Sequence, residues 1–85
     1  MHYVYILKSI KCDELYIGFT MSVVKRLAEH NTGLSISTKR YLPWKVVYLE
    51  GYANKFDAQD REQKLKQFGK VYSQLKIRIK NSLES

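Results

Sequence analysis

Residues 3–20 read YVYILKSIKCDELYIGFT, and this stretch decides the fold. Residues 3–7 and 15–20 are two apolar runs rich in aromatic and β-branched side chains, as is typical of β-strands. The segment between them is polar and turn-like. The stretch therefore predicts a β-hairpin.

The hairpin carries two tyrosines of particular interest, Tyr5 and Tyr16. Alternation along the first strand puts Tyr3, Tyr5 and Leu7 on one face. If Tyr5 lies across from Tyr16, then Tyr3 lies near Gly18 and its ring can cover a residue that has no side chain.

Beyond the hairpin, the sequence predicts a helix from Val23 to about His30, with Ser22 as its N-cap. Residues 32–41 are polar and basic and are expected to form a loop. Residues 44–50 form the most apolar of the three strand-like runs. We therefore expect them to form the central strand of the sheet.

A second helix is predicted from the N-cap Asn54 to about Phe68, where Gly69 ends it. The tail, residues 70–83, predicts a third helix, although residues 75–80 also alternate like a strand. The inward positions of that helix would be Tyr72, Leu75, Ile79 and Leu83. The order is β-β-α-β-α-α, which defines one α+β domain over residues 1–85 with a small, mostly antiparallel three-stranded sheet flanked by helices.

Composition points to a polyanionic partner. The 85 residues include 15 Lys and Arg against 8 Asp and Glu, a net charge of +7. Nucleic acid is the first candidate and an anionic membrane surface the second, although a small basic protein can also lack a specific partner. No segment has the length of a membrane span or a secretion signal, and Cys12 is the only cysteine, so we expect a cytoplasmic protein.

Three features are not explained by packing alone: the glutamate Glu62, the pair Arg26 and His30, and the pair Tyr5 and Tyr16. Each of these residues has two interpretations. Glu62 interrupts the apolar stripe formed by Ala58, Leu65 and Phe68 on the second helix, so it either forms an ion pair or binds Mg²⁺. Arg26 either covers the core edge with its stem or grips a phosphate. His30, one helical turn later, is an edge histidine or a proton carrier. Tyr5 and Tyr16 are packing residues or bases, although a free phenol has a pKa near ~10.

Together these residues resemble the GIY-YIG nuclease superfamily. Tyr3-Val4-Tyr5 stands where the family has GIY, and Tyr16-Ile17-Gly18 is the YIG itself. Residues 26–33, 38–50 and 58–66 resemble the first helix, the following loop and strand, and the helix with the metal-binding glutamate. The resemblance covers about residues 3 to 70. It is closest to short standalone bacterial members related to the N-terminal domain of the excision-repair nuclease, so DNA repair is an implied context.

The resemblance implies a metal-dependent endonuclease with one divalent ion, Mg²⁺ or Mn²⁺, held by Glu62. Arg26 would neutralise charge in the transition state and His30 would accept or relay a proton. Tyr5 would be the base and Tyr16 would orient water or phosphate, or the two roles are exchanged. A base of this kind requires cations that lower the pKa of the phenol. The nucleic-acid contacts would come from Gly18, Lys39, Arg40 and Lys66.

The sequence departs from the family pattern in two places. Tyr3 replaces the first glycine, and Phe19 follows the YIG glycine where repair-type members carry a lysine. These departures keep a second function open, a nucleic-acid-binding module that does not cleave. A third is a membrane-surface or protein-interaction role for the basic tail, residues 70–80. With no separate recognition domain, we expect the protein to choose its substrate by the structure of the nucleic acid rather than by base sequence. DNA is the expected substrate. We expect a monomer or weak dimer and no small-molecule cofactor.

Overall fold

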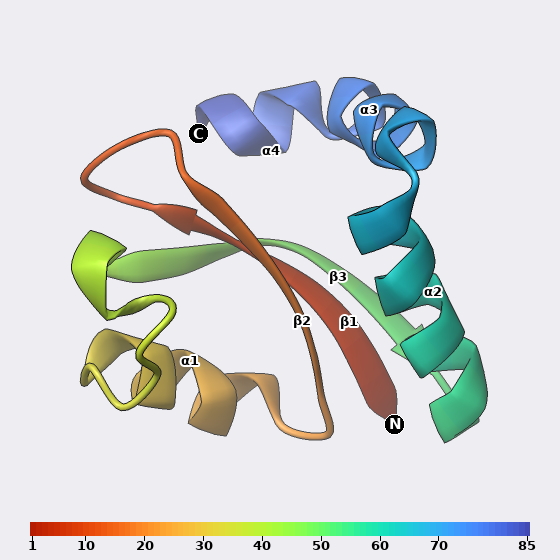
Figure 1. The fold of residues 1–85 in the computed structure, drawn as a ribbon, viewed down its shortest axis with the longest axis horizontal. Helices are drawn as coiled ribbons and strands as arrows, with labels where there is room; N and C mark the ends of the chain where they lie inside the picture. Colours follow the sequence, from red (N-terminus) through yellow and green to blue (C-terminus); the bar gives the residue numbers. More distant parts are fainter.

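The computed structural model describes residues 1–85 and contains a three-stranded antiparallel sheet. The predicted hairpin is confirmed: β1 (His2–Ser9) pairs with β2 (Leu15–Thr20). β3 (Trp44–Tyr52) pairs with the other edge of β1, giving the order β2-β1-β3 (Figure 1).

The expectation that residues 44–50 form the central strand is wrong, because β1 is central. Four consecutive residues of β1, from Val4 to Leu7, are at most 1% exposed. A strand that is paired on both edges and covered on both faces buries every side chain. β3 lies at an edge, and Trp44 is its only fully buried residue.

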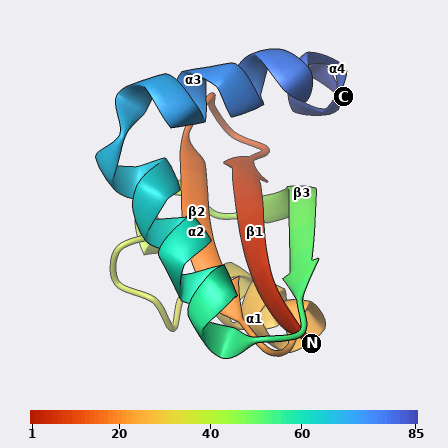
Figure 2. The same ribbon diagram turned by 90° about the vertical axis from the view of Figure 1, so that its right-hand side faces the viewer.

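Helices cover both faces of the sheet. On one face lie α1 (Val23–Asn31) and a short 3₁₀ turn, η1 (Lys39–Tyr41). On the other face α2 (Lys55–Gln67) runs along the sheet, and α3 (Gly69–Arg78) and α4 (Lys80–Glu84) cross its end (Figure 2). The order β-β-α-β-α-α and the α+β class are as predicted. None of the helices combines the length and the apolar character needed to cross a bilayer.

The alternation predicted for β1 is confirmed by two separate cores. Tyr5 and Leu7 pack with Trp44 beneath α1. Val4 and Ile6 face the other way, into the larger core beneath α2 and α3. That core is completed by Ile17, Ala58, Leu65, Leu75 and Ile79. β1 therefore holds the two halves of the molecule together.

The predicted helix starts are confirmed, but one predicted helix end is not. The Ser22 side chain accepts a hydrogen bond from the Lys25 amide, and the Asn54 side chain accepts one from the Phe56 amide. Gly69 does not end α2 by its own conformation, because it is the first residue of α3. Phe68 ends α2 by adopting an extended conformation (φ −111°, ψ 97°).

The position of Phe68 also differs from the predicted apolar stripe, because its side chain is 54% exposed. The turn at Phe68 directs α3 across the end of the sheet instead of prolonging α2. This path lets Leu75 and Ile79 reach the core that already contains Leu65. The alternative of a strand over residues 75–80 is wrong, and the predicted single tail helix is divided at Ile79 into α3 and α4.

A polar network joins α2 to β3. The Arg61 guanidinium donates to both carboxylate oxygens of Glu50, at 2.9 and 3.0 Å for the closest pairs. Tyr48 and Tyr52 each donate a 2.6 Å hydrogen bond to the same carboxylate. Burial alone would raise the pKa of Glu50, but these hydrogen bonds outweigh it and lower the pKa. The network therefore fixes the helix that carries Glu62.

Candidate active site

The register of the hairpin decides which tyrosine covers which glycine. Tyr5 lies across from Gly18, and Tyr16 lies across from Leu7. The condition considered from the sequence, Tyr5 across from Tyr16, is therefore not met, because the register differs from it by two residues. It is the Tyr5 ring, not the Tyr3 ring, that covers Gly18: a Cβ atom on Gly18 would lie 2.3 Å from the Tyr5 hydroxyl. The absence of a side chain at Gly18 is what lets the Tyr5 phenol lie across β2.

Tyr3 covers a glycine too, at the opposite edge of β1. It lies across from Gly51 of β3, where an added Cβ atom would be 3.3 Å from the Tyr3 ring. Tyr3 therefore does not narrow the region around Tyr5. Gly18 itself is buried, so we assign it a packing role and do not keep it among the nucleic-acid contacts.

Three rings gather above Gly18. The centroids of Tyr16 and His30 are 4.8 Å apart in an edge-to-face arrangement. Tyr5 lies 6.3 Å from Tyr16 and 6.1 Å from His30. His30 comes from the last turn of α1 and is fully buried. The rings from β1, β2 and α1 thus form one cluster, although they lie far apart in the sequence.

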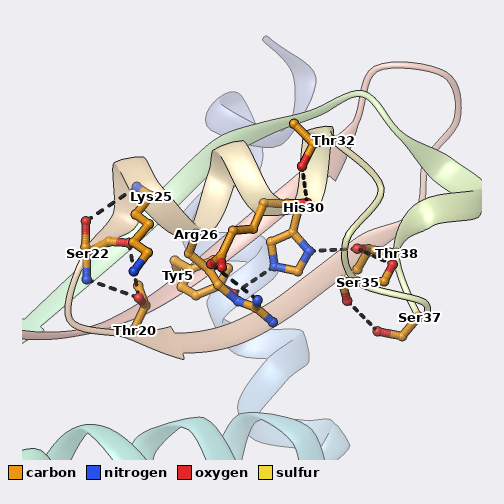
Figure 3. A network of polar contacts seen from close by, with 11 residues as sticks. Tyr5, Thr20, Ser22, Lys25, Arg26, His30, Thr32, Ser35, Ser37 and Thr38 are labelled. Atoms are coloured by element: carbon orange, nitrogen blue, oxygen red, sulfur yellow. Dashed lines mark hydrogen bonds and ion pairs between the residues drawn. The ribbon is translucent and has the colours of Figure 1, made fainter.

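Hydrogen bonds order this cluster. The Tyr5 hydroxyl is 3.0 Å from Nε2 of His30, and Nδ1 of His30 is 2.7 Å from the Thr38 hydroxyl (Figure 3). Thr38 precedes η1 and is 1% exposed. Sequence reasoning did not single out Thr38 as a site residue. In the sequence Thr38 is only a threonine in a polar loop, and this does not indicate that its side chain is buried against a histidine.

Arg26 completes the group on α1, one turn before His30. Its guanidinium lies beside the Tyr5 hydroxyl (Figure 3) and forms an ion pair with Glu29 at 3.6 Å. Burial tends to lower the pKa of Arg26, but hydrogen bonding to Tyr5 and Tyr16 raises it overall. The Arg26 side chain is 34% exposed, so its head can meet a ligand from solvent.

The pKa values of the cluster differ from the expectation for a tyrosine base. Burial raises the pKa of Tyr5 to about 12, although the adjacent Arg26 acts in the opposite direction. Burial, followed by the charge of Arg26, lowers the pKa of His30, with Glu29 opposing the shift. At neutral pH the pair therefore consists of a neutral phenol and a neutral imidazole.

Glu62 lies on α2, at the same edge of the sheet as Tyr16. Its carboxylate is 3.3 Å from the ammonium of Lys66, which in turn lies 5.9 Å from the centre of the Tyr16 ring. Lys66 and Tyr16 also line a shallow cavity of about 260 Å³. The Glu62 charge contributes to the raised pKa of Tyr5. α2 covers the face opposite α1, so Glu62 approaches the cluster only at the edge of the sheet, through Lys66 and Tyr16.

The three cations predicted to contact nucleic acid lie in two different places. Lys39 and Arg40 are exposed in η1, directly after Thr38. The Arg40 guanidinium lies 5.8 Å from the centre of the Tyr41 ring. Lys66 has a half-exposed side chain and occupies the rim between Glu62 and Tyr16. All three cations are thus accessible to a ligand.

The fold and this cluster together define a GIY-YIG domain. Residues 1–72 match the family model described as the GIY-YIG catalytic domain, and the chain belongs to that family.

Its relatives include short bacterial and archaeal proteins named UPF0213. One from Clostridium perfringens is 45% identical over 67 residues, 78% of this chain and 71% of that protein. One from Staphylococcus haemolyticus is 41% identical, covering 81% of this chain and 84% of the relative. A third, from Natronomonas pharaonis, is 36% identical over 82% of each chain. No solved structure shows a significant match.

Proposed function

We propose that this protein is a metal-dependent endonuclease that hydrolyses phosphodiester bonds in nucleic acid, with DNA as its preferred substrate and shape as its means of selection. The observation that supports this most directly is the gathering of two phenols, a guanidinium and a histidine around Gly18, within the electrostatic reach of Glu62. The family whose model matches the chain is described as a catalytic domain.

Tyr5 and His30 would act together on the attacking water. A phenol with a pKa of about 12 is protonated at neutral pH, so it can take a proton from water only if it releases its own. Nε2 of His30 lies 3.0 Å away and can receive that proton. Because Tyr5 passes its own proton to His30 as it takes one from water, Tyr5 does not have to be ionised before the reaction. Tyr16 would orient the water or the phosphate.

Arg26 would stabilise the charge that accumulates on the phosphate. A guanidinium carries a fixed fork of donors that matches phosphate oxygens in two places. Its head is partly exposed beside Tyr5, where a phosphate approaching the activated water would lie. Lys39, Arg40 and Lys66 would contact neighbouring phosphates.

Glu62 would hold the metal ion, and its surroundings fit this role. A single carboxylate suits Mg²⁺ or Mn²⁺, which keep several waters and bind substrate phosphate directly. The ion pair of Glu62 with Lys66 is partly exposed to solvent, and exposed ion pairs contribute little free energy. A divalent cation can therefore displace the lysine. When bound, the ion supplies charge stabilisation at the leaving oxygen.

The test is a cleavage assay with plasmid, single-stranded and branched DNA, in Mg²⁺ or Mn²⁺ and with a chelator. We expect cutting that the chelator abolishes and that Glu62→Gln or Arg26→Ala reduces by at least about 100-fold. Asp60→Asn is the matched control, because Asp60 lies on the same helix and pairs only with Lys64. Cleavage that survives Glu62→Gln, or an equal loss in Asp60→Asn, contradicts the proposed roles.

A second function, binding without cleavage, is favoured by two observations. Lys66 neutralises Glu62, and Phe19 lies where repair-type members carry a lysine. In this case DNA would be retarded but left intact under all metal conditions, and affinity would fall steeply with salt. The same assay therefore separates the two functions.

A further inference from the structure

The His30 ring is held from both sides. Nε2 lies 3.0 Å from the Tyr5 hydroxyl and Nδ1 lies 2.7 Å from the Thr38 hydroxyl. His30 and Tyr5 are at most 1% exposed, and so is Thr38. Because a neutral imidazole carries one hydrogen, one of its nitrogens must donate and the other must accept. The direction of these two hydrogen bonds decides whether His30 can take a proton from Tyr5.

The surroundings of Tyr5 favour one direction. The Arg26 guanidinium lies beside the Tyr5 hydroxyl, and a guanidinium has donors but no acceptor. The positive charge of Arg26 therefore favours an orientation of the Tyr5 hydroxyl in which the oxygen faces the guanidinium and the hydrogen points away from it, toward an acceptor. Nε2 of His30 is the acceptor within 3.0 Å, so it must be unprotonated.

The surroundings of Thr38 are compatible with the same direction. The Thr38 hydroxyl can donate to the Ser35 carbonyl, at 3.5 Å, which leaves its oxygen to accept the hydrogen on Nδ1. The backbone holds this residue firmly: the Trp44 indole donates to the Thr38 carbonyl at 3.0 Å, and the Tyr41 amide donates to it at 3.1 Å. Thr38 is therefore fixed in space before any ligand arrives.

We propose that Thr38 is a positioning residue of the active site, which holds His30 in the tautomer with hydrogen on Nδ1 and turns the lone pair of Nε2 toward the Tyr5 proton. This inference rests on the proposed function for its catalytic consequence. The tautomer itself can be measured without any substrate.

The consequence for hydrolysis follows from the proton balance. As the water oxygen bonds to phosphorus, a water proton passes to the Tyr5 oxygen. The bond to the leaving oxygen breaks, and this oxygen departs as an alkoxide that takes a proton from solvent. The proton of Tyr5 passes to Nε2, and His30 becomes an imidazolium that still donates from Nδ1 to Thr38. With valine at position 38, Nδ1 has no partner, and the form with hydrogen on Nε2 can face Tyr5. That form has no lone pair with which to accept.

Nitrogen-15 spectra of the histidine rings in the 85-residue chain test the tautomer. At neutral pH we expect His30 to show protonated Nδ1 and unprotonated Nε2 in the wild type and in Thr38→Ser. In Thr38→Val we expect this preference to be lost. His2, which stacks on Phe19 at the start of β1, serves as the internal reference in the same spectra. A wild-type ring protonated on Nε2 overturns the inference even if Thr38→Val does not fold.

Cleavage kinetics test the consequence. We expect Thr38→Val to lower kcat by about 10- to 100-fold, as is usual when a group that orients a functional histidine is removed, with KM changed less than about threefold. Thr38→Ser should restore most of kcat. An unchanged tautomer and an unchanged kcat in Thr38→Val overturn the positioning role. If the spectra are as expected but the wild type cuts no nucleic acid, then the proposed function fails while the assignment of the tautomer stands.

Discussion

At Gly18 a single methyl group would occupy space that the Tyr5 ring already fills. An added Cβ atom would lie 2.3 Å from both Cζ and Oη of Tyr5. Gly18 has an ordinary strand conformation, so the effect of alanine is steric and not conformational. We expect Gly18→Ala to lower the free energy of unfolding by about 1–3 kcal/mol, measured by urea denaturation. The displaced phenol should also lose its hydrogen bond to His30, and cleavage should fall with it.

Gly51→Ala is the matched control for that substitution. Gly51 also lies under a tyrosine ring, but its added Cβ atom would be 3.3 Å from the ring of Tyr3, at an edge strand where the ring can yield. We expect a change in stability within about 1 kcal/mol and no change in cleavage. Equal losses at both glycines would mean that the Tyr5 contact has no special importance.

The pH dependence of cleavage is also decided by single residues, Tyr5 and His30. Neutral His30 is the competent acceptor, and its pKa lies below the ordinary 6.5 because of burial and then Arg26. We expect kcat to fall on the acid side with a midpoint below 6.5. Between about pH 7 and 9 it should be flat, because the pKa of Tyr5 is about 12. A pH–rate profile measures this, and a midpoint above 7 would contradict the proton path from Tyr5 to His30.

At the scale of the elements, α2 depends on its attachment to β3 through Arg61 and Glu50. The Glu50 side chain is 15% exposed and accepts from Arg61, Tyr48 and Tyr52. We expect Arg61→Met to lower the free energy of unfolding by about 2–3 kcal/mol, because it leaves a largely buried carboxylate without its cation. Lys64→Met on the same helix breaks only the exposed pair with Asp60 and should cost less than about 0.5 kcal/mol. Similar losses in both variants would show that the network does not anchor α2.

The same network predicts an acid-dependent contribution to stability. The pKa of Glu50 is lower in the folded protein than the ordinary 4.5 of the unfolded chain. Its contribution is therefore fully present above about pH 4.5 and is lost as the pH falls through the folded value. Urea titrations between about pH 3 and 6 should show this loss in the wild type and a weaker one in Glu50→Gln. An equal pH dependence in the two proteins would exclude Glu50 as a source.

The elements were predictable from local chemistry, but their arrangement was only partly so. The N-caps Ser22 and Asn54 identify helix starts because their side chains act on neighbouring amides. The register of the hairpin depends on the loop between the strands and on the fit of Tyr5 over Gly18, which no local pattern contains. The central position of β1 escaped prediction because the apolar content of a strand does not reveal how many of its edges are paired. Thr38 escaped because its partner, His30, is brought to it by the fold.

For the whole molecule, the distribution of charge separates the proposed nucleic-acid face from the basic tail. Lys39 and Arg40 lie in η1, directly after the Thr38 that holds His30. The tail cations Lys70 and Lys80 lie on α3 and α4, which belong to the other face of the sheet from η1 (Figure 1). A net charge of +7 attracts a polyanion to the whole surface, but only a cation that contacts a phosphate adds to the release of counterions.

Two double variants that remove equal charge test which region meets the nucleic acid. We expect Lys39→Gln with Arg40→Gln to weaken DNA binding and to reduce the slope of log affinity against log salt by nearly 2, about 0.9 for each lost phosphate contact. Lys70→Gln with Lys80→Gln should leave the slope within about 0.5, because these exposed side chains would contribute only long-range attraction that salt screens. Fluorescence anisotropy at several salt concentrations, without divalent metal, measures both slopes on uncut DNA. If the tail variant loses the greater slope, the basic tail meets the nucleic acid and the face around η1 does not.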